Sequence, residues 1–413
     1  MLRKWIAVLA LCALLASPAA GFDTFWHTTV SKAVGQTFDF SPDAANILQL
    51  GNFSPDFFGP VAEYASGNLK NPAFAAFNQM GTSDTGVRQF AIFLHFDNLN
   101  QQLNSNSRFD YLFSQLLQTT RSLLADYNTR QDVDARTRKI LVLITLGASL
   151  HAVQDFYSHS DWIHNDFNKT KVKMARLPGG DERAPTWFEF RDKMGNPDKW
   201  PFQVRSGIYP PIPGVQDTHT RMNHDNSRLL YREYENPGQP LKSEAPYHNS
   251  GPEPAHEGDA ASIRRHQQLA VNTAIAASIE WVRKVEQNAG AKAAIESARG
   301  WDLKNTDSKL AKELQAGMAA EMAVSCAAGK WDGEDPPPES GAFCQSVLQN
   351  QVGSMPGGES GIASQVLGLA AGLGVPLALR YTGRFWSVHS RYNILGRLAE
   401  SIGTATGEYN FKK

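Results

Sequence analysis

The chain carries three ionisable side chains at helical spacing beside a long apolar run. His151, Asp155 and His159 follow one another at intervals of four residues, directly after the apolar residues 140–146. On a helix, side chains four residues apart share one face, so we expect these three to point to one place. Imidazole and carboxylate are ligands of zinc and similar divalent ions. The pattern indicates a metal site, although a half-buried helix whose polar residues satisfy one another would give the same spacing.

Three positions upstream could join this triplet. They are His27 in F-D-T-F-W-H, Asp56 in N-F-S-P-D-F, and His95 in F-L-H-F-D-N. Each is weak evidence alone, because a single histidine on an apolar face is more often a satisfied core residue. Together with the triplet they predict a site for more than one metal ion.

This order of residues resembles the zinc-dependent phospholipase C and single-strand-specific nuclease superfamily. The form H-x-x-x-D-x-x-x-H-S-D-W, which begins at His151, is most similar to the Het-C branch of that superfamily. The resemblance covers about residues 22–285 and implies an all-α zinc domain. In that family the first residue of the mature protein, usually tryptophan, binds zinc through its own amine and carbonyl. Cleavage after Gly21 would give Phe22 this place.

The resemblance implies two zinc ions that share the carboxylate of Asp155. Such a bridge is physically reasonable, because a shared anion offsets the repulsion between two nearby dications and fixes their spacing. One ion would be held by Asp56, His95, His151 and Asp155, and the other by Phe22, His27 and Asp155.

The resemblance assigns His159 to a third zinc ion, and there the sequence departs from the family. A late H-x-x-x-E or H-x-x-x-D pair is expected, and no histidine after His159 has that spacing. We favour His224 and His266 as substitutes, with Asp225 a weaker choice and a two-metal site still open. Asp161 and His164 lie close enough in sequence to compete for the same role.

Helical periodicity dominates the elements that would position these residues. Apolar residues recur every three or four positions, and no convincing alternating strand pattern interrupts them. We therefore expect an all-α, multi-helix domain over residues 22–295. The segments with this period are 24–38, 43–50, 86–98, 108–127, 134–163 and 259–288.

A long segment at about residues 165–258 interrupts the helices. It is rich in Pro, Gly, Asn and charge, with aromatic residues interspersed. Long connections are usually functional or disordered, and the aromatic residues favour a folded insertion beside the site. We expect Trp187 and Trp200 to contact the substrate, with a purely structural flap as the alternative.

The two ends of the chain suggest export and a second unit. Residues 1–21 combine a basic start, a short apolar stretch and small residues, which is typical of a secretory signal peptide, so we expect a secreted or periplasmic protein. Residues 296–413 are expected to form a smaller helical unit. There Cys326 and Cys344 would pair rather than stay free. The nearly uncharged run Gly361–Leu379 could be a core helix, a membrane-surface contact or a self-association face.

These features favour hydrolysis of a phosphodiester by two or three zinc ions. The leading hypothesis is an exported phospholipase C that binds phospholipid head groups at a membrane surface, most plausibly those of phosphatidylcholine. By resemblance, Asp56 would orient or deprotonate the attacking water. The net charge of -1 gives no general attraction for nucleic acid.

Two alternatives remain open. A single-strand-specific zinc nuclease would use the same ions and would stack bases on Trp187 or Trp200. A non-catalytic, Het-C-like assembly or toxin protein would use the metal to hold its helices together and the C-terminal unit to oligomerise.

Overall fold

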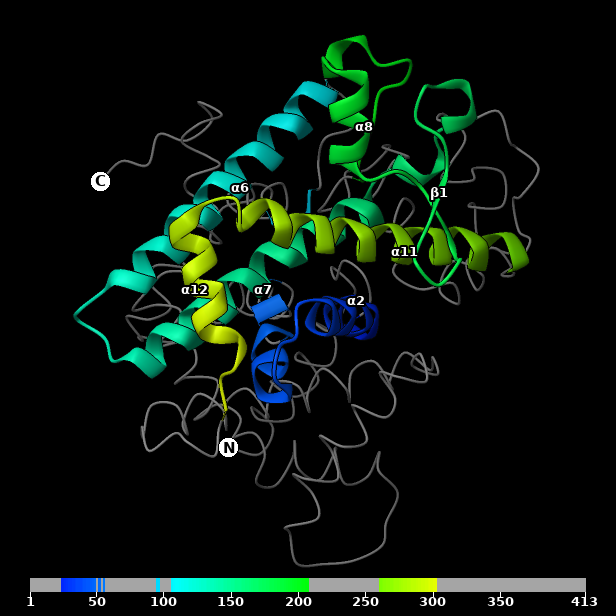
Figure 1. Cartoon of the computed structure of the whole chain (residues 1–413). Coiled ribbons are helices and arrows are strands. Elements are labelled where there is room, and N and C mark those ends of the chain that lie inside the picture. The colour runs from blue at the N-terminus through cyan, green and yellow to red at the C-terminus, as the bar shows by residue number, and fades with distance from the viewer. Residues whose placement is uncertain are drawn as a thin grey trace, which may run out of the picture.

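The computed structural model describes residues 24–49, 51–52, 55, 94–96, 105–207 and 260–302. These residues are mostly helical, as the sequence predicted, and their main elements pack around one central helix (Figure 1). The predicted signal peptide, Cys326 and Cys344, the run Gly361–Leu379 and most of the helix expected at 86–98 lie outside the described residues. The long helices are α2 (Thr24–Thr37), α6 (Ser105–Thr129), α7 (Ala135–His159), α11 (Ala260–Val285) and α12 (Ala289–Arg299). Residues 42–49 are also helical.

Helix α7 forms the centre of the core and contacts α2, α6, α11 and α12. Asp134 caps its N-terminus by accepting hydrogen bonds from the backbone N–H groups of Arg136 and Thr137, both at 2.9 Å. From Ile140 to His159 every residue of the helix is buried. Within the described residues, α7 is long and apolar enough to cross a membrane, but its whole apolar window is buried inside the protein. It therefore has the burial of a core helix.

Helix α7 ends at His159, four residues before the predicted end. Ser160 has an extended backbone and forms a bridge with Ser206, and a separate 3₁₀ turn, η1 (Trp162–His164), follows. The apolar periodicity of the sequence continues past the end of α7 because Trp162 and Ile163 are buried in the same core. His159 thus occupies the last position of the helix.

Two glycines bring residues 51–52 against α7. A Cβ on Gly147 would lie 2.7 Å from the backbone N of Asn52 and would also contact the Leu48 carbonyl oxygen. A Cβ on Gly51 would lie 2.6 Å from the Cα of Ile144. Both contacts are to backbone, which cannot rotate away as a side chain can. The two segments therefore approach each other closely because neither glycine has a side chain.

The described part of the predicted insertion is folded, and it contains the only two strands in the described residues. Strands β1 (Ala175–Arg176) and β2 (Glu182–Arg183) form a small antiparallel hairpin. Helix α8 (Trp187–Met194) follows, between the turns η2 (Phe167–Lys169) and η3 (Pro197–Lys199). Buried rings join this segment to α6 and α7; they include Phe109, Phe113, Phe156, Trp162, Trp187, Phe190 and Trp200.

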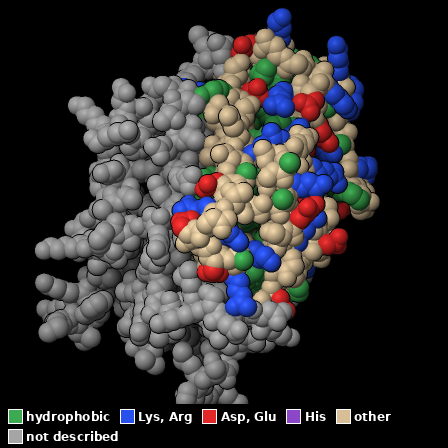
Figure 2. Space-filling view, turned by 60° about the vertical axis from the view of Figure 1, so that its left-hand side comes forward, with side chains coloured by type: hydrophobic (Ala, Val, Ile, Leu, Met, Phe, Trp, Pro, Cys, Tyr) green, Lys and Arg blue, Asp and Glu red, His purple; other side chains and the backbone are tan. Residues whose placement is uncertain are grey.

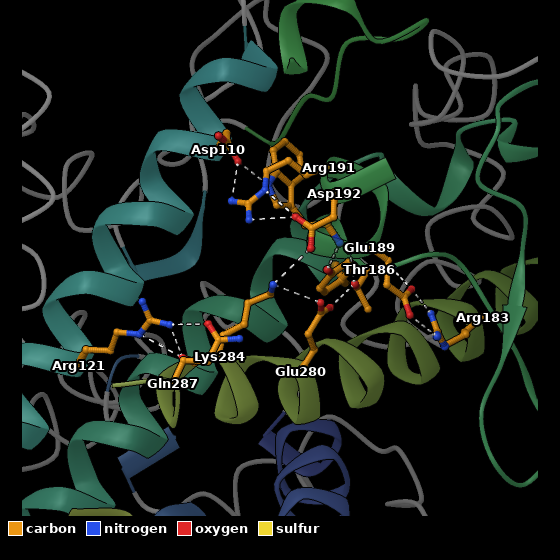
Figure 3. A network of polar contacts seen from close by, with 12 residues as sticks. Asp110, Arg121, Arg183, Thr186, Glu189, Arg191, Asp192, Glu280, Lys284 and Gln287 are labelled. Carbon is orange, nitrogen blue, oxygen red and sulfur yellow. Dashed lines mark hydrogen bonds and ion pairs between the residues drawn. The ribbon is translucent and has the colours of Figure 1, made fainter. Parts of the chain in front are cut away.

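A polar network attaches α8 to α11 (Figure 3). Thr186 caps α8 in a capping box with Glu189, and its hydroxyl also donates to Glu280 on α11. Lys284 lies 3.5 Å from Asp192 and 3.6 Å from Glu280. Burial raises the pKa of Glu280 even though the Thr186 hydrogen bond and Lys284 act to lower it. The insertion is therefore fixed to the core by both aromatic and polar contacts.

The helical packing continues past residue 295, where we expected the domain to end. Residue 295 lies within α12, which packs on α6 and α7. The buried Trp301 follows that helix, and the Ser41 hydroxyl donates to its carbonyl oxygen. On the described part of the face in Figure 2, acidic and basic side chains are interspersed, in keeping with the net charge of -1.

Candidate metal centre

The carboxylate of Asp155 lies between three histidines. Its Oδ1 is 3.2 Å from His27 Nε2, and its Oδ2 is 2.7 Å from His95 Nδ1 and 2.9 Å from His151 Nε2. Asp155, His27 and His151 are completely buried, and His95 is 5% exposed. Both oxygens of one carboxylate thus face imidazole nitrogens from different parts of the chain.

The cluster is built from three segments. Helix α2 supplies His27, residues 94–96 supply His95, and α7 supplies His151, Asp155 and His159. Their potential ligand atoms form two groups that share Asp155, and within each group all the atoms lie within 4.8 Å of one another. One group is His27, His151 and Asp155, and the other is His95, Asp155 and His159. The rings of His27 and His151 stack at 4.5 Å between centroids.

These groupings differ from the division that the resemblance implies. There His151 was placed with His95, and His159 with a separate third ion. In the structure His151 Nε2 is indeed 3.2 Å from His95 Nδ1, but His151 also lies in the group of His27, and His159 lies in the group of His95. All five side chains therefore belong to one continuous cluster.

The spacing of the donor atoms could accommodate a metal ion. In a tetrahedral zinc site with bonds of about 2.0–2.1 Å to nitrogen, neighbouring ligand atoms lie about 3.3 Å apart. The distances among the nearest atoms of His95, His151 and Asp155 run from 2.7 to 3.2 Å. The donor set combines imidazole and carboxylate, which both bind divalent metal ions. This cluster could therefore hold a metal ion with little rearrangement.

The electrostatics of the cluster also suit metal binding. Burial lowers the pKa of His151 to about 3, although the Asp155 carboxylate acts to raise it. His151 is therefore a neutral imidazole at neutral pH, which is the form that binds metals. Burial alone would raise the pKa of Asp155, but its contacts with the surrounding histidines outweigh burial and hold that pKa well below its usual range.

The backbone at residues 95–96 helps to position the group formed by His95, Asp155 and His159. His159 Nδ1 lies 3.0 Å from the carbonyl oxygen of His95, a contact that orients a metal-binding histidine when its other nitrogen is the ligand. Phe96 has a positive φ of 54°, which is unusual for a bulky residue, and its buried ring packs 4.6 Å from that of Phe113. Sequence reasoning missed Phe96, because nothing in the pattern marks a left-handed residue there.

Apart from His159, the candidates for a third metal site that are in the described residues lie outside the two groups. His266 is half-buried and packs against His164, with ring centroids 4.4 Å apart. The Asp161 carboxylate accepts from the backbone N–H of Arg205 at 2.8 Å and lies 3.4 Å from its guanidinium. Phe22, Asp56 and His224 lie outside the described residues, so their predicted roles remain predictions.

Trp187 and Trp200 do not occupy the positions expected of substrate-binding residues. Trp187 is completely buried and Trp200 is 6% exposed, with their rings 4.8 Å apart. Their indole N–H groups donate within the protein, to Asp110 and to the Gly195 carbonyl oxygen. In this structure both side chains are core residues, and neither ring face is open to a base or a head group.

Comparison of the chain with protein-family models, curated proteins and solved structures gives no match. The His and Asp groups are the part of the described structure that best supports chemistry.

Proposed function

We propose that this protein is a zinc-dependent phosphodiester hydrolase of the phospholipase C type. The observation that carries the proposal is the buried Asp155 carboxylate, which faces His27 through one oxygen and His95 and His151 through the other. A carboxylate in this arrangement can bridge two cations. Paired cations suit phosphodiester hydrolysis because they can neutralise charge on both the attacking and the leaving oxygen.

The roles of the residues follow from their chemistry. His27, His95, His151 and His159 would act as neutral nitrogen ligands, while Asp155 would supply the negative charge that the ions share. Bound zinc would provide Lewis acidity and would lower the pKa of a coordinated water towards neutrality. In the resemblance that motivates the lipid substrate, Asp56 would orient that water.

The first experiment measures metal content and hydrolysis together. We would determine zinc per chain by elemental analysis after exhaustive dialysis, and then assay phosphatidylcholine micelles and single-stranded oligonucleotides. We expect at least two zinc ions per chain and release of a phosphorylated head group. A folded protein that holds no metal would overturn the proposal.

Asp155→Asn tests the bridging carboxylate. This variant keeps the size of the side chain and removes the charge, so we expect it to lose zinc and at least roughly 100-fold in turnover. The matched control is Asp110→Asn, because Asp110 is a carboxylate on α6 that pairs with Arg191 and lies in neither metal group. Equal activity of Asp155→Asn and Asp110→Asn, with both proteins folded, would contradict the proposal.

The substrate assays separate the remaining possibilities. Cleavage of oligonucleotides with no attack on lipid would replace the phospholipase by a zinc nuclease. Tight zinc binding with neither activity would favour an assembly protein in which metal holds the helices together. Each result would overturn the lipid substrate while keeping the metal site.

A further inference from the structure

A buried glutamine next to Asp155 connects three segments of the chain. Gln154 is completely buried on α7. Its Oε1 lies 2.6 Å from His27 Nδ1 on α2 and 3.1 Å from Asn52 Nδ2. Its Nε2 donates to Ser278 Oγ on α11 at 3.2 Å. Among these three contacts, the one to His27 reaches a member of the metal cluster.

The contact with Asn52 sets which end of the amide faces His27, because the Ser278 hydroxyl can donate as well as accept and suits either end. The Nδ2 of Asn52 is a donor and needs an acceptor, which the carbonyl oxygen of Gln154 provides. The opposite end of the amide donates to Ser278 Oγ. With the amide held this way, His27 satisfies the contact by presenting a hydrogen on Nδ1.

The orientation of His27 has a direct consequence for metal binding. A neutral imidazole carries one proton, so a proton on Nδ1 leaves a lone pair on Nε2. His27 Nε2 is the atom that lies 3.2 Å from Asp155 Oδ1, in the direction of the shared carboxylate. Metal-binding histidines are commonly oriented in this way by an acceptor at the other ring nitrogen.

We propose that Gln154 is a positioning residue that fixes the Nδ1–H tautomer of His27 and so directs Nε2 towards the metal. This inference rests on the proposed function, because it assigns Gln154 a role in preparing the metal site. It makes the amide part of the site although an amide is not a ligand in either metal group.

Three variants separate the acceptor from simple packing. Gln154→Leu keeps roughly the volume of the side chain and removes the acceptor. Gln154→Glu keeps an oxygen for His27 and Asn52 and loses the donor to Ser278. Ser278→Ala is the matched control, because it breaks a buried hydrogen bond of the same amide on the side away from His27.

The measurements are zinc affinity, by competition with a chelator, and the tautomer of His27, by nitrogen-15 NMR. The His27 signal is assigned from its loss in His27→Asn. We expect Gln154→Leu to weaken zinc binding by about 10- to 100-fold and to lose the fixed Nδ1–H tautomer. We expect Gln154→Glu and Ser278→Ala to keep both within a few-fold of wild type.

Three results would overturn the inference. They are a His27 ring protonated on Nε2 in the zinc-loaded wild type, unchanged zinc affinity in Gln154→Leu, and an equal loss in Gln154→Leu and Gln154→Glu. If the wild type binds no zinc, the proposed function fails, but the tautomer can still be measured in the metal-free protein. In that case an Nδ1–H signal lost only in Gln154→Leu supports positioning by Gln154, and an Nε2–H signal refutes it.

Discussion

His151 makes the stability of the metal-free protein depend on pH. Its pKa is about 3 in the folded protein and near 6.5 when the chain is unfolded, because burial disfavours the charged ring. Between these values the unfolded chain binds a proton that the folded protein does not. The free energy of unfolding should therefore fall as the pH drops from 6.5 towards 3, by at most about 1.4 kcal/mol per pH unit. Asp155, whose folded pKa is lowered, should add to the loss below its ordinary value of 3.8.

The measurement is urea unfolding between pH 4 and 8 with a chelator present. Other histidines also titrate in this range, so the informative quantity is the difference between wild type and His151→Gln. We expect the variant to show a flatter dependence on pH. Parallel curves for the two proteins would mean that His151 titrates normally when folded.

At the level of residues, the sequence predicted the side chains that could bind a metal ion better than the residues that position them. His151, Asp155 and His159 were found from helical spacing, and the structure brings them together with His27 and His95. Gln154 was missed because it is neither acidic nor a usual metal ligand, and its role depends on contacts with residues 27, 52 and 278. Contacts across such distances in sequence cannot be read from local spacing.

Gly147 lies at a close approach between α7 and the backbone of residues 48–52. Gly147→Ala should destabilise the protein by roughly 1–3 kcal/mol or more, because the new Cβ would meet backbone atoms of residues 48, 51 and 52. It should also weaken zinc binding, since any shift of Asn52 disturbs the amide of Gln154 that contacts His27. Denaturant unfolding and chelator competition measure the two effects.

Gly300→Ala is the matched control for that variant. Gly300 follows α12 with a φ of -89°, and nothing lies within 4 Å of the Cβ that it would gain. We expect the Gly300→Ala variant to have the same stability and zinc affinity as the wild type. A Gly147→Ala protein as stable as Gly300→Ala would show that the two segments are not in backbone contact.

Among the elements, the long helices were predictable and their surroundings were not. The sequence placed α2, α6, α7 and α11 close to their observed bounds because apolar residues recur in each with a period of three to four residues. It did not show that α7 is buried on all sides from Ile140 to His159. It could not show that Trp187 and Trp200 are buried, since aromatic residues in an irregular segment look the same whether they cover a core or bind a ligand. Only the packing of α8 decides between these cases.

For the whole molecule, the cluster is a junction between parts that are far apart in the chain. Asp155 on α7 contacts His27, 128 residues earlier, and His95, 60 residues earlier. Helix α2 contacts α7 and α11, whereas α6 packs on α7 and α12 without contributing a ligand. A metal ion at Asp155 would therefore stabilise some elements directly and leave others unaffected.

Removal of the metal should lower the free energy of unfolding, and the elements that contribute side chains to the cluster should be affected most. Zinc at 1,000 times its dissociation constant adds about 4 kcal/mol to the free energy of unfolding, so a chelator should lower the melting temperature of the wild type. Hydrogen exchange should increase mainly in α2 and residues 94–96, which reach the core partly through His27 and His95. It should change least between α6 and α12, where the packing contains no member of the cluster. Asp155→Asn should show no response to the chelator. A uniform increase in exchange over all helices would instead mean that the ion stabilises the fold as a single cooperative unit.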